Sequence, residues 1–191
     1  SVNGVYYASI ENAIAAAAEN DTIEIAAGEH EIGNVNVNKA VNIKGAGSEY
    51  TVLVGSFDFR DFSSSTTNKE ITVEGITVKS PEDNTAVEQG IEWGYSTSDT
   101  LQGFTLNVVN CKVEDYLFAI GVNSSAKNCV LNVRNLELQD VWCGANVSEG
   151  AGNSVGDYEI AAGSKVTYEI QVFDSKAGYN CYYETTEKWL A

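Results

Sequence analysis

The chain has 191 residues, and its 27 acidic and 11 basic side chains give a formal charge of −16. This charge argues against a nucleic-acid partner, which needs a basic surface, and 43% hydrophobic residues argue against an acidic disordered tail. No stretch is long and apolar enough for membrane insertion, and the length suits one domain over 1–191. Because the sequence contains no Met, we expect a fragment of a larger protein with neighbouring domains.

The first predicted element is an α-helix over 9–20. Ser9 suits the N-cap and Glu11 suits the first turn. Apolar residues recur at helical spacing at Ile10, Ala13, Ile14 and Ala17. The alternating segment 21–28 follows as a short strand. We expect the helix to cap the N-terminal end of the fold, because a stacked core leaves apolar surface at both ends.

Five segments of eight residues share one pattern. They are 41–48, 71–78, 106–113, 131–138 and 170–177. Their first and third positions are apolar and their second is polar, which is typical of a β-strand with one buried face. The fifth position holds Gly45, Gly75, Asn110, Asn135 and Asp174, residue types that tolerate positive φ. Each repeat is therefore predicted to be a strand, a one-residue corner and a second strand.

A third strand is predicted in two copies, over 117–125 and 142–150. Three short strands per turn predict an all-β solenoid of about six turns. Segments 81–99 and 149–167 are rich in Gly, Ser, Asn and acids, so we predict loop insertions there. The aromatic segment 179–191 either covers the last turn, through Tyr182, Tyr183 and Trp189, or leads into further chain.

The four cysteines, Cys111, Cys129, Cys143 and Cys181, contain no CxxC pair, and the chain has one histidine. A Cys/His metal site is therefore not expected. Free buried thiols are the simplest interpretation. A single Cys143–Cys181 bridge stays open.

Residues 6–47 resemble the opening of right-handed parallel β-helix proteins of the pectin-lyase-like superfamily. The matching residues are Asp21-Thr22-Ile23 and the segment 41–47, with Ala27-Gly28 in place of an expected Pro-Gly. Asn110 and Asn135 are similar to the asparagine ladder of that fold. The resemblance implies a right-handed parallel β-helix. The opening also looks like modules of large surface proteins of Gram-positive bacteria, which implies a secreted or cell-wall-attached, extracellular location.

The enzymes of that superfamily, pectate lyases and polygalacturonases, suggest an active site. The chain has no Asp-Asp, Asn-Thr-Asp or Gly-His-Gly motif. Its outward fourth repeat position places the apolar Val109 between Glu74 and Arg134, which is a poor arrangement for lyase chemistry. Carboxylates at the turn exits, Glu114, Asp115, Glu137 and Asp140, fit a solvated acidic edge. We therefore predict no catalytic residue, metal or cofactor, with a polysaccharide lyase or glycoside hydrolase as the alternative.

The second repeat position predicts a line of amides, Asn107, Asn132 and Gln171, flanked by Asn42 and Thr72. Stacked amides can hydrogen-bond one another, or they can meet sugar hydroxyls. The candidate ligand-binding residues are these three amides together with Arg134, Trp93, Tyr95 and Trp142, whose aromatic rings could stack on a sugar.

The sequence therefore predicts a non-catalytic cell-surface module for adhesion or display. Such a module could hold a glycan or another host or cell-surface ligand. Beside the enzyme, a passive structural spacer is the second alternative to this module, and it is favoured if Trp93 and Tyr95 fold onto the rod instead of lying exposed beside the amides.

Overall fold

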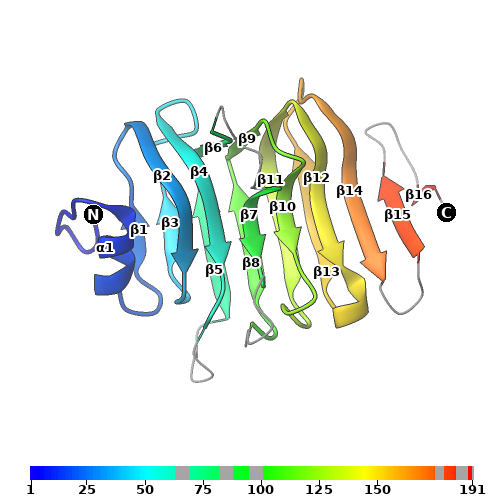
Figure 1. Ribbon diagram of the computed structural model, residues 1–191, viewed down its shortest axis with the longest axis horizontal. Coiled ribbons are helices and arrows are strands. Elements are labelled where there is room, and N and C mark those ends of the chain that lie inside the picture. Colours follow the sequence, from blue (N-terminus) through cyan, green and yellow to red (C-terminus); the bar gives the residue numbers. More distant parts are fainter. Residues whose placement is uncertain (63–68, 82–87, 95–100, 175–178, 184–188, 191) are drawn as a thin grey trace.

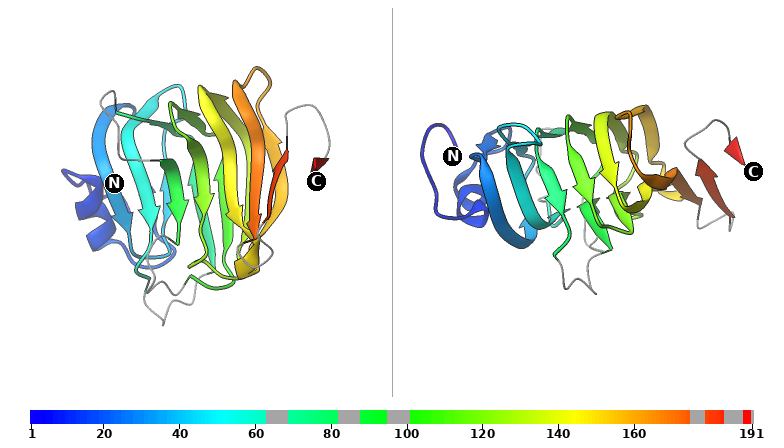
Figure 2. Two further views of the ribbon diagram at one scale, coloured as in Figure 1. Left: turned by 45° about the vertical axis from the view of Figure 1, so that its right-hand side comes forward. Right: turned by 90° about the horizontal axis from the view of Figure 1, so that it is seen from above.

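The computed structural model describes residues 1–62, 69–81, 88–94, 101–174, 179–183 and 189–190. Its strands lie side by side along the long axis of the molecule and form a parallel β-solenoid (Figures 1 and 2). Every pairing among the named strands from β1 to β14 is parallel, and only the pairings of β14 with β15 and of β15 with β16 are antiparallel.

The strands form three files, each a set of strands stacked in parallel register. The first file contains β1 (Thr22–Glu24), β3 (Asn42–Lys44), β5 (Glu70–Glu74), β8 (Thr105–Val109), the first half of β11 (Val130–Gln139) and β13 (Ser154–Ile160). The second contains the first parts of β2 (Gly28–Val37) and β4 (Thr51–Phe59), then β6 (Thr77–Lys79), β9 (Lys112–Glu114) and the second half of β11.

The third file begins with the second parts of β2 and β4. It continues through β7 (Gln89–Trp93), β10 (Phe118–Val122), β12 (Val141–Ser148) and β14 (Val166–Asp174). Beyond it lie β15 (Tyr179–Tyr183) and β16 (Trp189–Leu190). The predicted third strands over 117–125 and 142–150 are thus confirmed, as β10 and β12.

The predicted register is confirmed for four of the five repeat copies. Leu106 pairs with Ile71 on one side and with Leu131 on the other, as the alignment requires. The corner residues Gly75, Asn110 and Asn135 have φ of 65°, 51° and 52°. Gly45 does not have a positive φ; a Cβ there would instead collide with the backbone of Gly75 in the next turn. Close approach of successive turns therefore explains this glycine.

The predicted register is wrong for the fifth repeat copy, 170–177. Ile170 pairs with Ala145 of β12, so segment 170–177 begins in the third file, and Asp174 does not continue the corner column. The first-file strand at this point is β13, inside the segment 149–167 that was predicted as a loop; a short 3-10 helix, η1 (Glu149–Ala151), precedes it. β13 carries register shifts against β11 and is only partly buried, so its sequence lacks a clean alternation.

The predicted loop over 81–99 also contains a strand. β7 pairs with β4 and β10, and Ile91 and Trp93 point into the core with no exposed surface. Glu92, one of the acids that suggested a loop, lies between the buried Ile91 and Trp93 and takes the outward side of the strand. Residues 82–87 and 95–100 lie outside the described residues.

The core runs along the inside of the solenoid and is built from all three files. Its largest fully buried side chains are Trp93, Phe57, Phe59 and Phe104. The rings of Phe59 and Trp93, which pair in register on β4 and β7, stack with centroids 4.9 Å apart. Stacking between aromatic rings of successive strands thus stabilises the packing of one turn on the next.

The helix α1 (Ile10–Ala16) lies at the N-terminal end of the stack, beside β1 and β2 (Figure 1). The predicted N-cap is confirmed, because the Ser9 hydroxyl accepts a hydrogen bond from the Asn12 amide at 3.3 Å. The helix is shorter than the predicted 9–20, since Ala17 is already extended. At the C-terminal end of α1, Lys39 Nζ donates hydrogen bonds to the carbonyl oxygens of Ile14, Ala15 and Ala17 at 2.7–2.9 Å. Among the described residues, no helix has the length and apolarity needed to span a membrane.

Cys111, Cys129 and Cys143 are free and buried. Burial raises the pKa of the Cys111 thiol to about 11 and that of the Cys143 thiol to about 12, so neither forms a reactive thiolate at neutral pH. The Cys143–Cys181 bridge left open by the sequence is therefore not formed. The side chain of Cys181 lies outside the described residues.

Candidate functional site

The outward side of the first file carries a continuous hydrogen-bonded ladder. The Asn42 side-chain oxygen accepts from the Thr72 backbone N–H at 2.9 Å, and the Thr72 hydroxyl accepts from the Asn107 amide at 3.4 Å. The Asn107 oxygen accepts from the Asn132 amide at 3.1 Å, and the Asn132 oxygen accepts from the Asp157 backbone N–H at 3.2 Å. The structural interpretation of the predicted amide line is thus confirmed for Asn107 and Asn132.

Gln171 does not belong to this ladder. It pairs with Asn146 in the third file and is almost completely buried, so the prediction that it continues the line after Asn132 is wrong. The backbone of β13 takes that place instead. A side chain at Gly156 would collide with the Asn132 amide, which explains why a small residue lies there.

The two ends of the ladder differ in their capacity for a ligand. Asn107 uses both amide hydrogens, one on Thr72 and one on the Glu70 carboxylate at 3.0 Å. Within the described part of the chain, the Asn42 amide nitrogen and the Thr72 hydroxyl hydrogen donate to no protein atom. Open donors therefore lie at the Asn42–Thr72 end.

A shallow groove of about 380 Å³ lies over that same end, across β1, β3 and β5. It is lined by Asn20, Thr22, Asn42, Ile43, Lys44, Glu70, Thr72 and Glu74. Its charged lining residues are Lys44, Glu70 and Glu74, with Lys44 Nζ 3.3 Å from Glu74 Oε2, and its amides and hydroxyls are neutral. This groove over β1, β3 and β5 is called the amide groove below.

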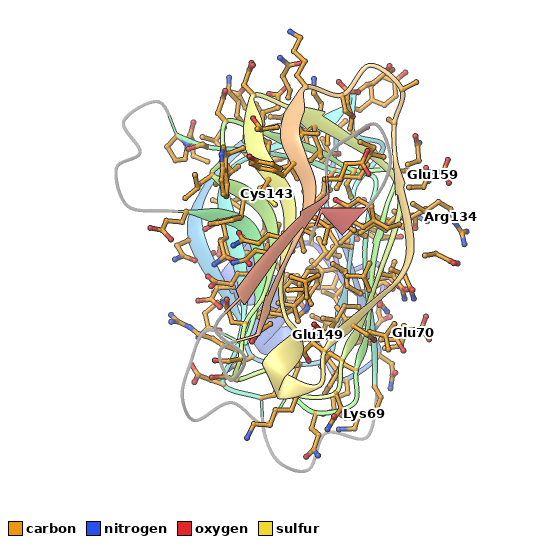
Figure 3. The ribbon with its side chains drawn as sticks, turned by 90° about the vertical axis from the view of Figure 1, so that its right-hand side faces the viewer. Lys69, Glu70, Arg134, Cys143, Glu149 and Glu159 are labelled. Atoms are coloured by element: carbon orange, nitrogen blue, oxygen red, sulfur yellow. The ribbon has the colours of Figure 1, made fainter. Side chains whose placement is uncertain are left out.

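Arg134 is exposed on the outward side of the first file, next to Val109. Glu74 lies on the far side of Val109, as predicted, so the apolar residue separates the two charges. Figure 3 looks along the stack from its C-terminal end and places Arg134, Glu159 and Glu70 on one side of the solenoid. The structure therefore assembles no lyase-like pair of Glu74 and Arg134.

Two of the predicted aromatic residues, Trp93 and Trp142, do not join the amides. Trp93 is 0% exposed and occupies an inward position of β7, so its ring is not available to a sugar and the prediction that it binds a ligand is wrong. Tyr95 lies outside the described residues. Trp142 is 36% exposed, but it belongs to the third file, where its ring meets Phe118 and Tyr168 edge-on at 5.5 and 5.3 Å. Trp93 thus lies inside the solenoid and Trp142 in a different file from the amides.

The outward side of the third file contains a polar cluster that the sequence did not predict. Glu92 lies in register with Asp58 on β4, and Arg60 Nε is 3.1 Å from the Asp58 carboxylate. Gln89 donates to Glu92 Oε1 at 3.0 Å, and the Asn123 amide donates to the same oxygen. These five residues are called the Glu92 cluster.

Burial, and secondly the charge of Asp58, raise the pKa of Glu92 to about 7. Glu92 therefore carries a proton in a large share of molecules at neutral pH. Two sequence triplets, Phe57-Asp58-Phe59 and Ile91-Glu92-Trp93, have the same apolar–acidic–apolar pattern. That pattern could have revealed the cluster had 89–93 been assigned to a strand.

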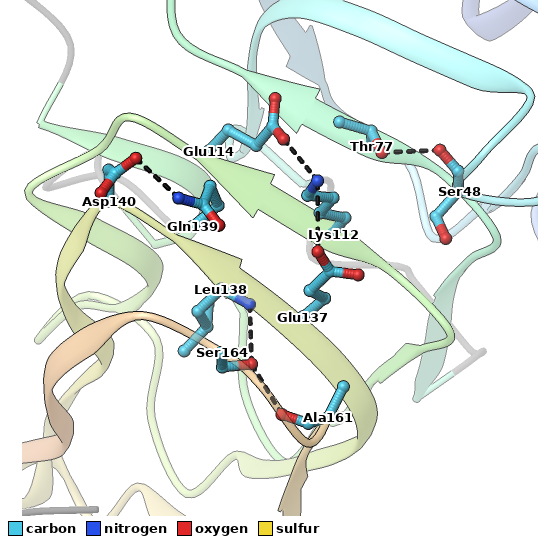
Figure 4. Close-up of polar contacts among 10 residues, drawn as sticks. All are labelled: Ser48, Thr77, Lys112, Glu114, Glu137, Leu138, Gln139, Asp140, Ala161 and Ser164. Atoms are coloured by element: carbon cyan, nitrogen blue, oxygen red, sulfur yellow. Dashed lines mark hydrogen bonds and ion pairs between the residues drawn. The ribbon is translucent and has the colours of Figure 1, made fainter.

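The acidic residues of the second file are partly neutralised. Lys112 lies between Glu114 at 2.6 Å and Glu137 at 3.2 Å, and its hydrogen bonds to these carboxylates, that to Glu114 first, raise its pKa (Figure 4). Beside them, Gln139 donates to Asp140 at 2.7 Å. Across the described residues, no group of three or more His, Cys, Asp or Glu side chains is arranged to hold a metal ion.

The comparisons with known proteins do not assign a family. The chain gives no significant match to a protein-family model, a curated protein or a solved structure.

Proposed function

We propose that the chain is a right-handed parallel β-helix of six turns, related to the pectin-lyase-like superfamily, with α1 as its N-terminal cap. The three files of parallel strands, the corner column at Gly75, Asn110 and Asn135, and the buried face of α1 support this proposal. The resemblance of residues 2–17, together with a β-helix, to modules of large bacterial surface proteins supports an extracellular, secreted or wall-attached module with neighbouring domains in one longer protein.

We propose further that this module is non-catalytic and serves adhesion or surface display by holding a carbohydrate in the amide groove. The observation that carries the proposal is the coincidence of the groove with the unused donors of Asn42 and Thr72. Sugar hydroxyls require neutral donors and acceptors in a shallow, open surface, and this groove provides them.

The charge of the chain narrows the class of carbohydrate. A formal charge of −16 repels uronic-acid and sulfated polymers, and Lys44 is already paired with Glu74. The groove therefore suits a neutral glycan.

A glycan array followed by titration calorimetry tests this function. In Thr22→Val, a hydroxyl that lines the groove and has no protein partner among the described residues is replaced by an isosteric methyl group. We expect affinity for the selected glycan to fall about three- to ten-fold, the equivalent of one hydrogen bond. Thr105→Val is the matched control, because this threonine is equally half-buried in the first file but lies outside the groove. Equal losses in both variants would contradict the site, and an array without any ligand would favour the passive spacer.

One observation favours the enzymatic alternative, a polysaccharide hydrolase or lyase. The Glu92 cluster places a carboxyl with a pKa of about 7 in register with a second carboxyl, that of Asp58, and paired carboxyls in unlike environments serve in general-acid catalysis. Incubation with neutral and acidic polysaccharides, with and without calcium, tests it. Product formation that is abolished by Glu92→Gln or by Arg134→Ala would replace the non-catalytic proposal.

A further inference from the structure

A second groove, of about 480 Å³, lies at the N-terminal end of the solenoid. It is formed between the segment 6–9, α1 and the strands β1 and β2, at the end marked N in Figure 2. It is separate from the amide groove: the two share none of their lining residues. This feature is called the tyrosine groove below.

The tyrosine groove has an apolar floor and an aromatic rim. The isoleucines that line it are Ile10, Ile23, Ile25 and Ile32. Tyr6 is 87% exposed and Tyr7 is 37% exposed, and neither hydroxyl bonds to another described residue. Large apolar side chains that stay exposed beside a groove are typical of a contact surface.

The charge of the tyrosine groove is predominantly negative. Its lining contains the carboxylates of Glu11, Glu24 and Glu31 and no Lys or Arg side chain, and the Ser1 ammonium, which also lines it, donates to the Glu24 backbone oxygen. In the described residues, none of these carboxylates forms an ion pair, and Glu24 only accepts a hydrogen bond from the Ser1 hydroxyl at 3.0 Å.

The neighbouring lysines do not neutralise these carboxylates. Lys39 Nζ is bound to carbonyl oxygens at the end of α1. Lys44, which pairs in register with Glu24, holds Glu74 instead. With three carboxylates against one ammonium, the groove therefore keeps a net negative rim around an apolar floor.

We propose that the tyrosine groove docks a basic peptide segment of another protein. Lys or Arg side chains would lay their aliphatic stems on the isoleucine floor and bring their charged ends to Tyr6, Tyr7 and the three carboxylates. Cation–π attraction and charge pairing then act on the same group. A second copy of this chain does not fit, because a molecule with a charge of −16 is repelled by an acidic groove.

Fluorescence anisotropy with labelled hexa-arginine and hexa-lysine peptides, and a neutral Gly-Ser peptide of equal length, tests this inference. The full chain is compared with the double variant Tyr6→Ala/Glu31→Gln. We expect the cationic peptides to bind, the neutral peptide not to bind, and the variant to lose about five- to ten-fold in affinity.

The matched control is Tyr50→Ala/Glu49→Gln, which removes an exposed tyrosine and an exposed glutamate outside the groove and changes the net charge equally. This control variant is expected to keep the affinity of the original chain. An equal loss in both variants would show binding to the acidic surface at large and would overturn the inference. Absence of binding to both cationic peptides at low salt would overturn it as well. Unchanged melting temperatures in both variants show that the altered affinity is not a loss of folding.

Discussion

The outward sides of the first and third files have the same architecture but opposite chemistry. In the first file, in-register stacking places Asn107 next to Asn132, and the Asn132 amide nitrogen donates a hydrogen bond to the Asn107 side-chain oxygen. In the third file the same stacking brings Glu92 onto Asp58, and two carboxylates repel each other. Amides stacked in successive turns therefore stabilise one another, whereas stacked carboxylates repel each other unless a neighbouring group reduces the repulsion. The repulsion between Glu92 and Asp58 is reduced by the Arg60 guanidinium, by the hydrogen bond from Asn123 and by protonation of Glu92.

The largest expected effect tests whether β7 is a strand of the stack at all. Trp93→Ala removes a fully buried ring that stacks on Phe59, so we expect a loss of about 3–5 kcal/mol in the free energy of unfolding. Urea denaturation measures it. The control Trp142→Ala, at a partly exposed site, should lose much less, and similar losses in both would mean that 89–93 is not buried.

The second prediction introduces a carboxylate, as found in the third file, into the amide ladder of the first file. Asn107→Asp places a carboxylate in the amide ladder, where it faces Glu70 and has no hydrogen to donate. We expect a loss of about 2–3 kcal/mol at pH 7 that shrinks at pH 4, when carboxylates become protonated. Denaturation at both pH values measures it, and a loss that is independent of pH would argue against repulsion as the cause. Asn34→Asp, at an exposed position of the third file that pairs in register with Ser56, is the control.

The third prediction removes one carboxylate of the Glu92–Asp58 pair in the third file. The pKa of Glu92 is raised from 4.5 to about 7, so its favourable contribution is complete below pH 4.5 and is lost as the pH rises through 7. Glu92→Gln imitates the protonated form and should therefore stabilise the protein at pH 8, on the order of 1–2 kcal/mol after allowance for solvent screening, and change little at pH 4. Thermal melts across this range measure the difference. A variant less stable than the original chain at pH 8 would mean that the charged form is the favoured one.

The smallest effect concerns the corners that join the first file to the second. Asn135 has φ of 52°, which alanine adopts at a cost of about 1 kcal/mol and glycine adopts freely. We expect Asn135→Ala to destabilise the protein by that amount and Asn135→Gly to be nearly neutral, although both lose the 3.0 Å hydrogen bond to Asn110. If the two variants lose equal stability, the hydrogen bond and not the backbone conformation determines the choice of asparagine.

Much of the fold could be predicted because its signals are local. Alternation with a period of two marked the buried positions of β5, β8 and β11, and Gly or Asn at a fixed offset marked their corners. β7 and β13 were missed because outward polar residues and glycines mask the alternation in β7, and register shifts interrupt it in β13. Of the candidate site, the Asn107–Asn132 contact was predictable, since it needs only the repeat.

By itself, the sequence determined that the chain alternates, turns at Gly and Asn corners and stacks its repeats into a solenoid. Only the tertiary structure decided which strand stacks on which. It moved Gln171 to the third file, buried Trp93, and brought together Asp58 and Glu92, which lie 34 positions apart in the chain. The physical reason is that strand periodicity and corner conformation depend on a few neighbouring residues. Register between turns depends on how all three files pack around one core, and segments of unequal length between the strands hide it.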